Sequence, residues 1–353
     1  MSSGKPWIVL VGGFLGSGKT TLILAASRIL AQQGLRSAVI LNDQGSDLVD
    51  THHAKMHGVL ANEITGGCFC CRFSELASAI EQMRLHAPEV IFAEPVGSCT
   101  DIAATVLSPL REEFLQYRLA PFTVLVDPAR AASLFNANAD SNQSFLFQKQ
   151  LQEADLVCMS KADLHPNAAR ISNVETRYLS AKTGQGVQEW LNEILSGTLT
   201  AGTKLLDIDY ERYARAEAAL AWLNLSLIFE PRSPLAPAPV IGPFLDRLDE
   251  ALTAAKISII HLKLFDHTPT GWLKAAICAN GEEPVVEGAL DASPAKSHGL
   301  LLNLRAAGDP AQVREIVEWQ MQNLEGSVHS IQMECFSPEA PKPERRVLRA
   351  YLS

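Results

Sequence analysis

The sequence predicts an α/β fold with a mostly parallel sheet in residues 1–200 and a smaller α+β domain in residues 201–353. Short apolar runs alternate with helix-length segments in the first part, and a glycine-rich segment follows the first run. Near residue 200 the sequence changes character, and strands and helices then follow in an order typical of antiparallel sheets. A chain of 353 residues is long enough for two such cores.

The apolar runs of the first domain predict strands that are buried on both faces of a sheet. They lie at residues 7–11, 37–41, 90–93, 122–126, 156–160 and 174–179. Helical periodicity predicts a helix over 20–33, where Gly34 ends it, and further helices over 74–83 and 187–195. This alternation is typical of a parallel sheet covered by helices on both faces.

The second domain is predicted to be a small layered α+β structure, with a ferredoxin-like fold as one hypothesis. Strands are predicted at residues 222–229, 257–264, 272–278, 299–305 and 327–336. A proline-rich loop is predicted over 231–243, followed by a helix to about residue 255, and a second helix over 310–323. The last residues, 337–353, are predicted to be a loosely held tail.

Charge and composition exclude several classes of protein. The formal net charge is -9, with no block rich in lysine or arginine, which argues against a general binder of nucleic acid or anionic membranes. No apolar run reaches about 18 residues, and we predict neither a signal peptide nor a membrane span. The seven cysteines are odd in number and clustered, so we expect a reducing, cytoplasmic setting.

The segment from Gly13 to Thr20 fits the phosphate-binding pattern G-x-x-x-x-G-K-[ST]. Its backbone N–H groups and the start of the following helix are suited to phosphate oxygens. We expect Lys19 to reach the β and γ phosphates, the Thr20 hydroxyl to bind Mg²⁺, and Glu94 to hold a water of the magnesium shell. The alternative for Glu94 is a solvated glutamate at a strand end. The predicted nucleotide contacts are Gly13, Gly16, Ser17, Gly18, Lys19, Thr20 and Thr21.

Two later segments favour guanine as the base. "SKAD" places Lys161 and Asp163 after one strand, and "SAK" places Ser180, Ala181 and Lys182 after the next. An aspartate carboxylate can accept both N–H groups of the guanine Watson–Crick edge, which adenine does not offer. We therefore predict GTP, although Ser160 stands where the usual N-K-x-D pattern has asparagine.

The stretch "GGCFCC" gathers Cys68, Cys70 and Cys71 between the phosphate loop and Glu94. Thiolates suit a soft or borderline ion, so we predict a site for Zn²⁺ or Co²⁺, with Cu(I) and Ni²⁺ also conceivable. A following helix and Arg72 are expected to lower the thiol pKa values. Three sulfurs leave one position of a tetrahedral site open, which favours exchangeable binding over a closed structural zinc. The alternatives are a structural zinc, three small buried residues, and a redox sensor, which the absence of a C-x-x-C spacing disfavours.

The fourth ligand has three candidates from sequence: Asp43, His53 or a residue of a partner protein. Asp43 is included in the predicted metal site because a carboxylate is an acceptable zinc ligand. His52, His53 and His57 are otherwise expected on a solvated helix face. The remaining cysteines are scattered and are predicted to be small core residues: Cys99, Cys158, Cys278 and Cys335.

Five segments occur in a characteristic order along the chain: "GGFLGSGKTT", "LNDQG", "GGCFCC", "AEPVG" and "SKAD". With these segments the chain resembles the CobW-like metal-chaperone GTPases, a group named from cobalamin synthesis and nitrile hydratase activation. The resemblance covers about the first 200 residues. It implies a GTPase that binds a transition metal at Cys68, Cys70 and Cys71 with GTP and Mg²⁺ bound and delivers that metal to a client metalloprotein. Because no lysine or arginine finger can be assigned from the sequence, we expect slow hydrolysis that depends on a partner or on a homodimer.

The chain departs from the family pattern in two places. The usual N-E-F-G is Asn42-Asp43-Gln44-Gly45 here, which keeps an acidic group and loses the aromatic one. The second half is less typical, and "ERYARAEAALAWLN" with "EPVGSCTD" suggests a divergent branch linked to corrinoid metabolism. The competing hypotheses are a regulatory or assembly GTPase with structural zinc, and an enzyme acting on a small molecule.

Overall fold

The structure, a computed structural model, describes residues 4–45, 49–136, 140–169, 171 and 175–348. It divides into two compact units, of which the first comprises Met1–Gln44, Asp50–Ala216 and Ala340–Ser353 and the second Gly45–Val49 and Glu217–Glu339. The boundary therefore differs from the one predicted near residue 200. Residues 201–216 stay with the first unit because Tyr210 and Tyr213 hydrogen-bond to it, and the end of the chain returns to it.

The first unit is built on a parallel sheet with the strand order β3-β2-β4-β1-β6-β7-β8, and β5 also pairs with β1. Its strands are β1 (Trp7–Gly13), β2 (Ser37–Asn42), β3 (Leu60–Ile64), β4 (Val90–Glu94), β5 (Arg118–Leu119), β6 (Thr123–Val126), β7 (Leu156–Met159) and β8 (Thr176–Tyr178). The predicted parallel sheet is confirmed. The sequence did not predict β3 and β5, since β3 is a half-buried edge strand and β5 has two residues.

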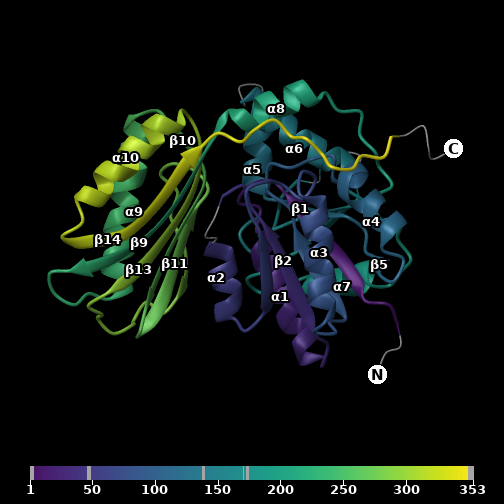
Figure 1. Ribbon diagram of the computed structural model, residues 1–353, viewed down its shortest axis with the longest axis horizontal. Helices are drawn as coiled ribbons and strands as arrows, with labels where there is room; N and C mark the ends of the chain where they lie inside the picture. Colours follow the sequence, from purple (N-terminus) through teal and green to yellow (C-terminus); the bar gives the residue numbers. More distant parts are fainter. Residues whose placement is uncertain (1–3, 46–48, 137–139, 170, 172–174, 349–353) are drawn as a thin grey trace. The chain divides into compact units, whose positions relative to one another are not determined.

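Helices lie between many strands of this sheet and after its last strand (Figure 1). They are α1 (Lys19–Gln32), α2 (Val49–Met56), α3 (Phe73–Arg84), α4 (Ser108–Glu113), α5 (Pro128–Leu134), α6 (Ser141–Glu153), α7 (Val187–Ile194) and α8 (Tyr210–Ala218), with a π-helical turn, η1 (Ala103–Leu107), before α4. The chain turns from β1 toward β2 and β4 on one side and toward β6 on the other. Ligands of such sheets bind outside the carboxyl ends of the strands at this switch point.

The second unit is an antiparallel sheet with the order β12-β11-β10-β13-β9-β14. Its elements are β9 (Leu220–Pro231), α9 (Pro237–Ala254), β10 (Ser258–Thr268), β11 (Gly271–Ile277), β12 (Val285–Gly288), β13 (His298–Ala307), α10 (Pro310–Gln322) and β14 (Gly326–Phe336). Without β11 and β12, this is the β-α-β-β-α-β order of the ferredoxin-like fold. Figure 1 shows α9 and α10 together on one face of the sheet.

The core of the second unit lies between this sheet and the two helices, with Leu223, Leu248, Leu304 and Val313 fully buried. The predicted loop over 231–243 is wrong in its second half, because α9 begins at Pro237. Proline is favoured in the first turn of a helix, where its missing N–H has no intrahelical partner, so prolines there do not indicate a loop. Across the described residues, no helix combines the length and apolar character needed to cross a membrane.

Candidate functional site

The phosphate loop joins β1 to α1 and has the backbone that its glycines allow. Gly13, Gly16 and Gly18 have φ values of 134°, 79° and 91°, which side-chain-bearing residues rarely adopt. A Cβ on Gly13 would also collide with the carbonyl oxygen of Leu125. Gly18 is the N-cap of α1 and provides no side-chain hydrogen bond, so the first N–H groups of this helix face the loop uncapped. Such a helix start is suited to binding an anion.

The predicted catalytic side chains meet beside this loop. The Thr20 hydroxyl donates to Glu94 Oε2 at 2.8 Å, and Lys19 Nζ lies 3.9 Å from Glu94 Oε1 and donates to the carbonyl oxygen of Gly13 at 3.0 Å. All three residues are at least nine-tenths buried, whereas Thr21 is half-buried in α1. Glu94 is the last residue of β4, so the strand end holds its carboxylate against the loop.

The residues present fit a magnesium nucleotide. The Ser17 hydroxyl is buried without a hydrogen-bond partner among the described residues, as expected for a donor aimed at an absent phosphate. The Lys19 ammonium bonds within the loop in place of a phosphate oxygen. Thr20 and Glu94 already bring a hydroxyl and a carboxylate together, which is the oxygen chemistry that Mg²⁺ prefers.

The two segments predicted to bind guanine lie at neighbouring strand ends. The Ala162 N–H donates to the carbonyl oxygen of Leu179 at 3.1 Å, which joins the loop after β7 to the loop after β8. Asp163 is exposed, so its carboxylate is accessible to a base. In the second segment Ser180 is buried and its Oγ accepts the Thr183 N–H, while Ala181 is half-buried and Lys182 exposed.

Sequence reasoning missed the residue that holds Lys161. Lys161 Nζ lies 2.6 Å from the carboxylate of Asp127, and Lys161 has a left-handed backbone with φ of 54°. Asp127 also caps α5 by accepting the Ala129 N–H. The hydroxyl of Ser160 donates to the carbonyl oxygen of Val126, so this loop has a brace in the absence of the usual asparagine.

The three predicted metal-binding thiols form one cluster between β3 and α3. The Cys68 and Cys70 sulfurs are 2.7 Å apart, Cys68 and Cys71 are 3.4 Å apart, and Cys70 and Cys71 are 3.7 Å apart. Sulfurs around a tetrahedral zinc with Zn–S bonds of 2.3 Å are separated by about 3.8 Å. Two of the three separations are therefore close to those of a metal site, and the first must widen by about 1 Å.

Cys99 is a small buried residue, as predicted, and a hydrogen bond from its thiol helps to lower the pKa of Cys68. Sequence spacing could not reveal this contact because the two cysteines are 31 positions apart. Cys99 is not part of the group with metal-binding distances, which among the described residues comprises Cys68, Cys70 and Cys71. Cys158 is a fully buried core residue of β7, as predicted, whereas Cys278 and Cys335 are half-buried and the prediction is wrong for them.

The thiols do not share the uniform drop in pKa predicted from Arg72 and the helix start. Hydrogen bonds from Cys70, Cys71 and Cys99 hold the pKa of Cys68 well below its usual value. The contact with Cys68 raises the pKa of Cys70 and raises that of Cys71 to about 11. One thiolate is thus stabilised by neighbours that stay protonated, so a metal must displace their protons.

Asn42 at the end of β2 scaffolds the thiol loop. Its side-chain amide donates to the carbonyl oxygens of Ile64 and Gly67 at 2.9 and 2.7 Å, and its oxygen accepts the Phe69 N–H at 2.7 Å. These partners extend from the last residue of β3 to Phe69. The asparagine of "LNDQG" therefore has a positioning role that its sequence alone did not indicate.

Two of the three candidates for a fourth ligand, Asp43 and His53, do not join the cluster, and the third, a residue of a partner protein, stays a prediction. Among the described residues, the group with metal-binding distances contains the three cysteines of the motif and neither Asp43 nor a histidine. His53 is buried in α2, and its Nε2 lies 3.0 Å from Nε2 of His57.

The carboxy-terminal residues lie across the thiol loop, and the predicted loose tail is wrong for residues 340–348. The Lys342 N–H donates to Cys71 Sγ at 3.1 Å, and the Glu344 N–H donates to the carbonyl oxygen of Cys70 at 2.9 Å. The Glu344 carboxylate accepts the N–H and the hydroxyl of Ser74 at 2.9 and 2.6 Å. The composition of this segment is typical of a free chain end. Its hydrogen bonds to the distant thiol loop and to Ser74 nevertheless hold it in place.

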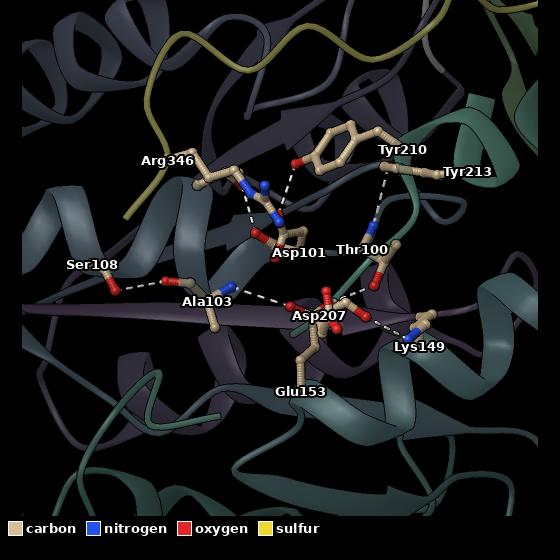
Figure 2. Close-up of polar contacts among 11 residues, drawn as sticks. Thr100, Asp101, Ala103, Ser108, Lys149, Glu153, Asp207, Tyr210, Tyr213 and Arg346 are labelled. Atoms are coloured by element: carbon tan, nitrogen blue, oxygen red, sulfur yellow. Dashed lines mark hydrogen bonds and ion pairs between the residues drawn. The ribbon is translucent and has the colours of Figure 1, made fainter. Parts of the chain in front are cut away.

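A buried polar cluster connects the same tail to the loop after β4 (Figure 2). Arg346 Nε donates to the Asp101 carboxylate at 2.9 Å, and the Tyr210 hydroxyl donates to it at 2.7 Å. The carboxylate of Glu153 accepts the Thr100 hydroxyl at 3.0 Å and the Ala103 N–H at 3.1 Å. These contacts fix the position of the segment that carries Cys99.

Known proteins resemble the first unit of this chain. Residues 7–188 match the family described as CobW/HypB/UreG, nucleotide-binding domain. The zinc chaperone YjiA of Escherichia coli (strain K12) is 31% identical over 177 residues, 47% of this chain and 54% of YjiA. The urease accessory protein UreG of Photorhabdus laumondii is 27% identical over 213 residues, 52% of this chain and 90% of UreG.

Solved structures align with much of this chain at low sequence identity. The crystal structure of the Zn(II)-bound YjiA GTPase from E. coli aligns with 91% of this chain and 99% of its own at 17% identity and a TM-score of 0.35. In sequence, the chain spans about half the length of the curated zinc chaperones it matches. Since the family match covers more than half of the chain, the chain belongs to the CobW/HypB/UreG family of nucleotide-binding domains, as the resemblance predicted.

Proposed function

We propose that this protein is a GTP-hydrolysing metallochaperone that binds zinc or cobalt at Cys68, Cys70 and Cys71 and delivers the ion to a client protein. The observation that carries the proposal is the placement of a buried thiol cluster on the same sheet edge as the phosphate loop. A soft-metal site next to a nucleotide site allows the state of one to change the affinity of the other.

The nucleotide half of the proposal uses the phosphate loop. Mg²⁺, when bound, supplies positive charge that offsets the charge on the phosphates. Lys19 would offer its ammonium to the β and γ phosphates, the Thr20 hydroxyl would hold the ion, and the Glu94 carboxylate would serve the hydration shell of the ion. We propose that Asp163, with the loop from Ser180 to Lys182, selects guanine. Hydrolysis is then slow until a partner or a second copy of the chain completes the site.

Thermodynamic linkage gives the main test. If GTP strengthens metal binding, the metal must strengthen GTP binding by the same factor. Zinc and cobalt affinities are measured with a competing chelator in the presence of a non-hydrolysable GTP analogue and of GDP. We expect tighter metal binding with the analogue, and equal affinities in the two states would refute the switch.

Two variants separate the two halves of the function. Cys70→Ala removes a thiolate and should lower metal affinity while leaving GTP binding in place. Lys19→Ala should lower GTP binding and hydrolysis while metal binding without nucleotide persists. Cys158→Ala, a buried cysteine of β7 remote from the motif, is the matched control and should change neither.

The burial of Cys68 and Cys70 favours a second candidate, an assembly or regulatory GTPase with a permanent zinc. A closed site with four ligands is typical of structural zinc. This candidate predicts that zinc stays bound in every nucleotide state and that chelation unfolds the first unit. Retention of the fold after chelation, together with faster zinc exchange in the GDP state, would exclude it.

We further propose, as a narrower form of this function, that the client protein belongs to corrinoid metabolism. The two divergent segments "EPVGSCTD" and "ERYARAEAALAWLN" support this narrower form. The test is affinity capture with the metal-loaded chain held in the analogue-bound state, followed by metal transfer to each captured protein. A client with no relation to corrinoids would contradict the narrower form and leave metal delivery itself intact.

A further inference from the structure

We propose that residues 340–348, which we call the strap, gate the thiol cluster, so that a metal ion enters and leaves when the strap lifts from the thiol loop. This inference rests on the proposed function, because it treats a transition metal as the cargo of Cys68, Cys70 and Cys71. It adds a gating element made of this chain's own carboxy-terminal residues, and it concerns the rate of metal exchange and the accessibility of the metal-free thiols.

The sequence of the strap suits an extended segment that binds through its backbone. Prolines stand at Pro341 and Pro343, and residues 340–348 form neither a helix nor a strand. Proline fixes its own φ and disfavours helical backbone in the residue before it, so Lys342 is held in an extended stretch. Because proline has no N–H, Lys342 offers the only backbone donor between Pro341 and Pro343.

This donor is bonded to the thiol cluster. The Lys342 N–H donates to Cys71 Sγ at 3.1 Å, and the Glu344 N–H donates to the carbonyl oxygen of Cys70 at 2.9 Å. Cys68 and Cys70 are 2% and 1% exposed, whereas Cys71 is half-buried. The strap therefore contacts the most exposed thiol of the cluster, which is the thiol that an incoming ion or donor group meets first.

The carboxylate of Glu344 fastens the strap to α3. Its Oε2 accepts the Ser74 N–H at 2.9 Å and the Ser74 hydroxyl at 2.6 Å. Ser74 lies in the first turn of α3, so the carboxylate also meets the positive end of the helix. Both residues are exposed, and water can replace these bonds when the strap lifts.

The strap is held more firmly toward its carboxy-terminal end (Figure 2). Arg346 Nε donates to the fully buried Asp101 carboxylate at 2.9 Å, and the guanidinium lies 4.7 Å from the centroid of the Tyr210 ring. The Val347 N–H donates to the carbonyl oxygen of Ala104 at 3.0 Å. An ion pair with a buried partner is less easily replaced by water than a surface contact is. The part of the strap over the thiols can therefore lift while Arg346 and Val347 stay attached.

Lifting this part of the strap exposes little apolar surface. Between residues 340 and 345, Pro341 is buried and the other side chains are half-buried or exposed. Segments with few buried apolar contacts and with exposed hydrogen bonds open locally most readily. The closed strap covers Cys71, and the lifted strap leaves it open to an ion, a chelator or a donor group of the client. The strap therefore sets how fast ligands of the cluster exchange.

Thiol labelling of the metal-free, full-length chain is the first test. A small maleimide is added, and modification of Cys71 is followed by mass spectrometry, with the half-buried Cys278 as the internal reference. Glu344→Ala removes both bonds to Ser74, so Cys71 should be labelled about 10-fold faster than in the wild type. Glu344→Gln removes the same charge but keeps an acceptor oxygen, and Glu339→Ala makes the same change at another exposed glutamate. Both of these variants should be labelled at nearly the wild-type rate.

Metal exchange is the second test, with Co²⁺ as the probe. Each chain is loaded with Co²⁺ and mixed with an excess of chelator, and the decay of the Co²⁺–thiolate absorption gives the rate of release. Glu344→Ala should release Co²⁺ about 10-fold faster than the wild type, because the open state of the strap is more populated. Glu344→Gln and Glu339→Ala should release it at nearly the wild-type rate.

The outcomes separate this inference from the proposed function. If Glu344→Ala labels Cys71 no faster than the wild type does, the strap does not cover the thiols, and the metallochaperone proposal stands without it. If labelling accelerates and Co²⁺ release does not, the strap does not gate the ion, which also refutes the inference. If the wild type binds no Co²⁺, the proposed function fails, and the labelling rates alone decide whether the strap covers the thiols. Should Glu344→Ala unfold, Ser74→Ala, which removes one of the two bonds, replaces it with a smaller expected increase.

Discussion

Replacement of Glu153 by glutamine should make the first unit more stable at neutral pH. Glu153 is fully buried at the end of α6, where it accepts the Thr100 hydroxyl and the Ala103 N–H. Glutamine can keep both contacts, because its oxygen accepts the Ala103 N–H and its NH₂ group donates to the Thr100 oxygen. At neutral pH the carboxyl must take up a proton when the chain folds, whereas glutamine is already neutral. The substitution therefore removes the cost of this protonation without leaving a buried polar group unpaired.

The magnitude follows from the pKa of this carboxyl. Burial, with the negative charge of Asp101 as a smaller contribution, raises the pKa of Glu153 from 4.5 to about 8. Between these values the folded state binds more protons than the unfolded state, so the free energy of unfolding falls as pH rises through this window. At pH 7 the penalty is about 3 kcal/mol, and at pH 4.5 or below it disappears.

The assay is urea unfolding of the metal-free chain, followed by circular dichroism at several pH values between 4.5 and 8. The gain in unfolding free energy of Glu153→Gln over wild type should grow with pH from near zero to about 3 kcal/mol at pH 7. Glu112→Gln, the same charge change at an exposed position of α4, should show no such trend. A difference that does not vary with pH, or a variant less stable than wild type throughout, would refute the reasoning.

Three further changes test other contacts. Asn42→Ala removes three hydrogen bonds to the thiol loop. It should lower the free energy of unfolding by about 2–4 kcal/mol and weaken Co²⁺ binding, and an unchanged Co²⁺ affinity would contradict the scaffold role of Asn42. Arg346→Gln leaves the buried Asp101 carboxylate without its ion pair and should destabilise the first unit by about 2 kcal/mol. The carboxy-terminal residues should also be cleaved faster by a protease, and an unchanged cleavage rate would argue against a fixed tail. Asp163→Asn should weaken GTP binding at least about 10-fold and favour a xanthine nucleotide, whose 2-oxo group can accept from the amide; retained GTP preference would show that another group selects the base.

Much of the first unit could be predicted because its determinants are local. A strand, a glycine loop with Lys19 and Thr20, and the helix that follows are contiguous, and each residue type has a conformational or chemical reason to be there. The parallel sheet follows from strands that are apolar on both faces. The start of α9 at Pro237 was missed, because proline is compatible with both a loop and a first helical turn.

The nucleotide loop and the three thiols of the motif were thus determined by the sequence itself, since neighbours in the chain remain neighbours in space. Only the tertiary structure decided which distant groups surround them. Asn42 reaches the thiol loop from β2, and the backbone N–H groups of Lys342 and Glu344 bond to Cys71 and Cys70. Contacts of this kind depend on strand order and loop path, and one sequence read along its length does not contain the spacing that would reveal them.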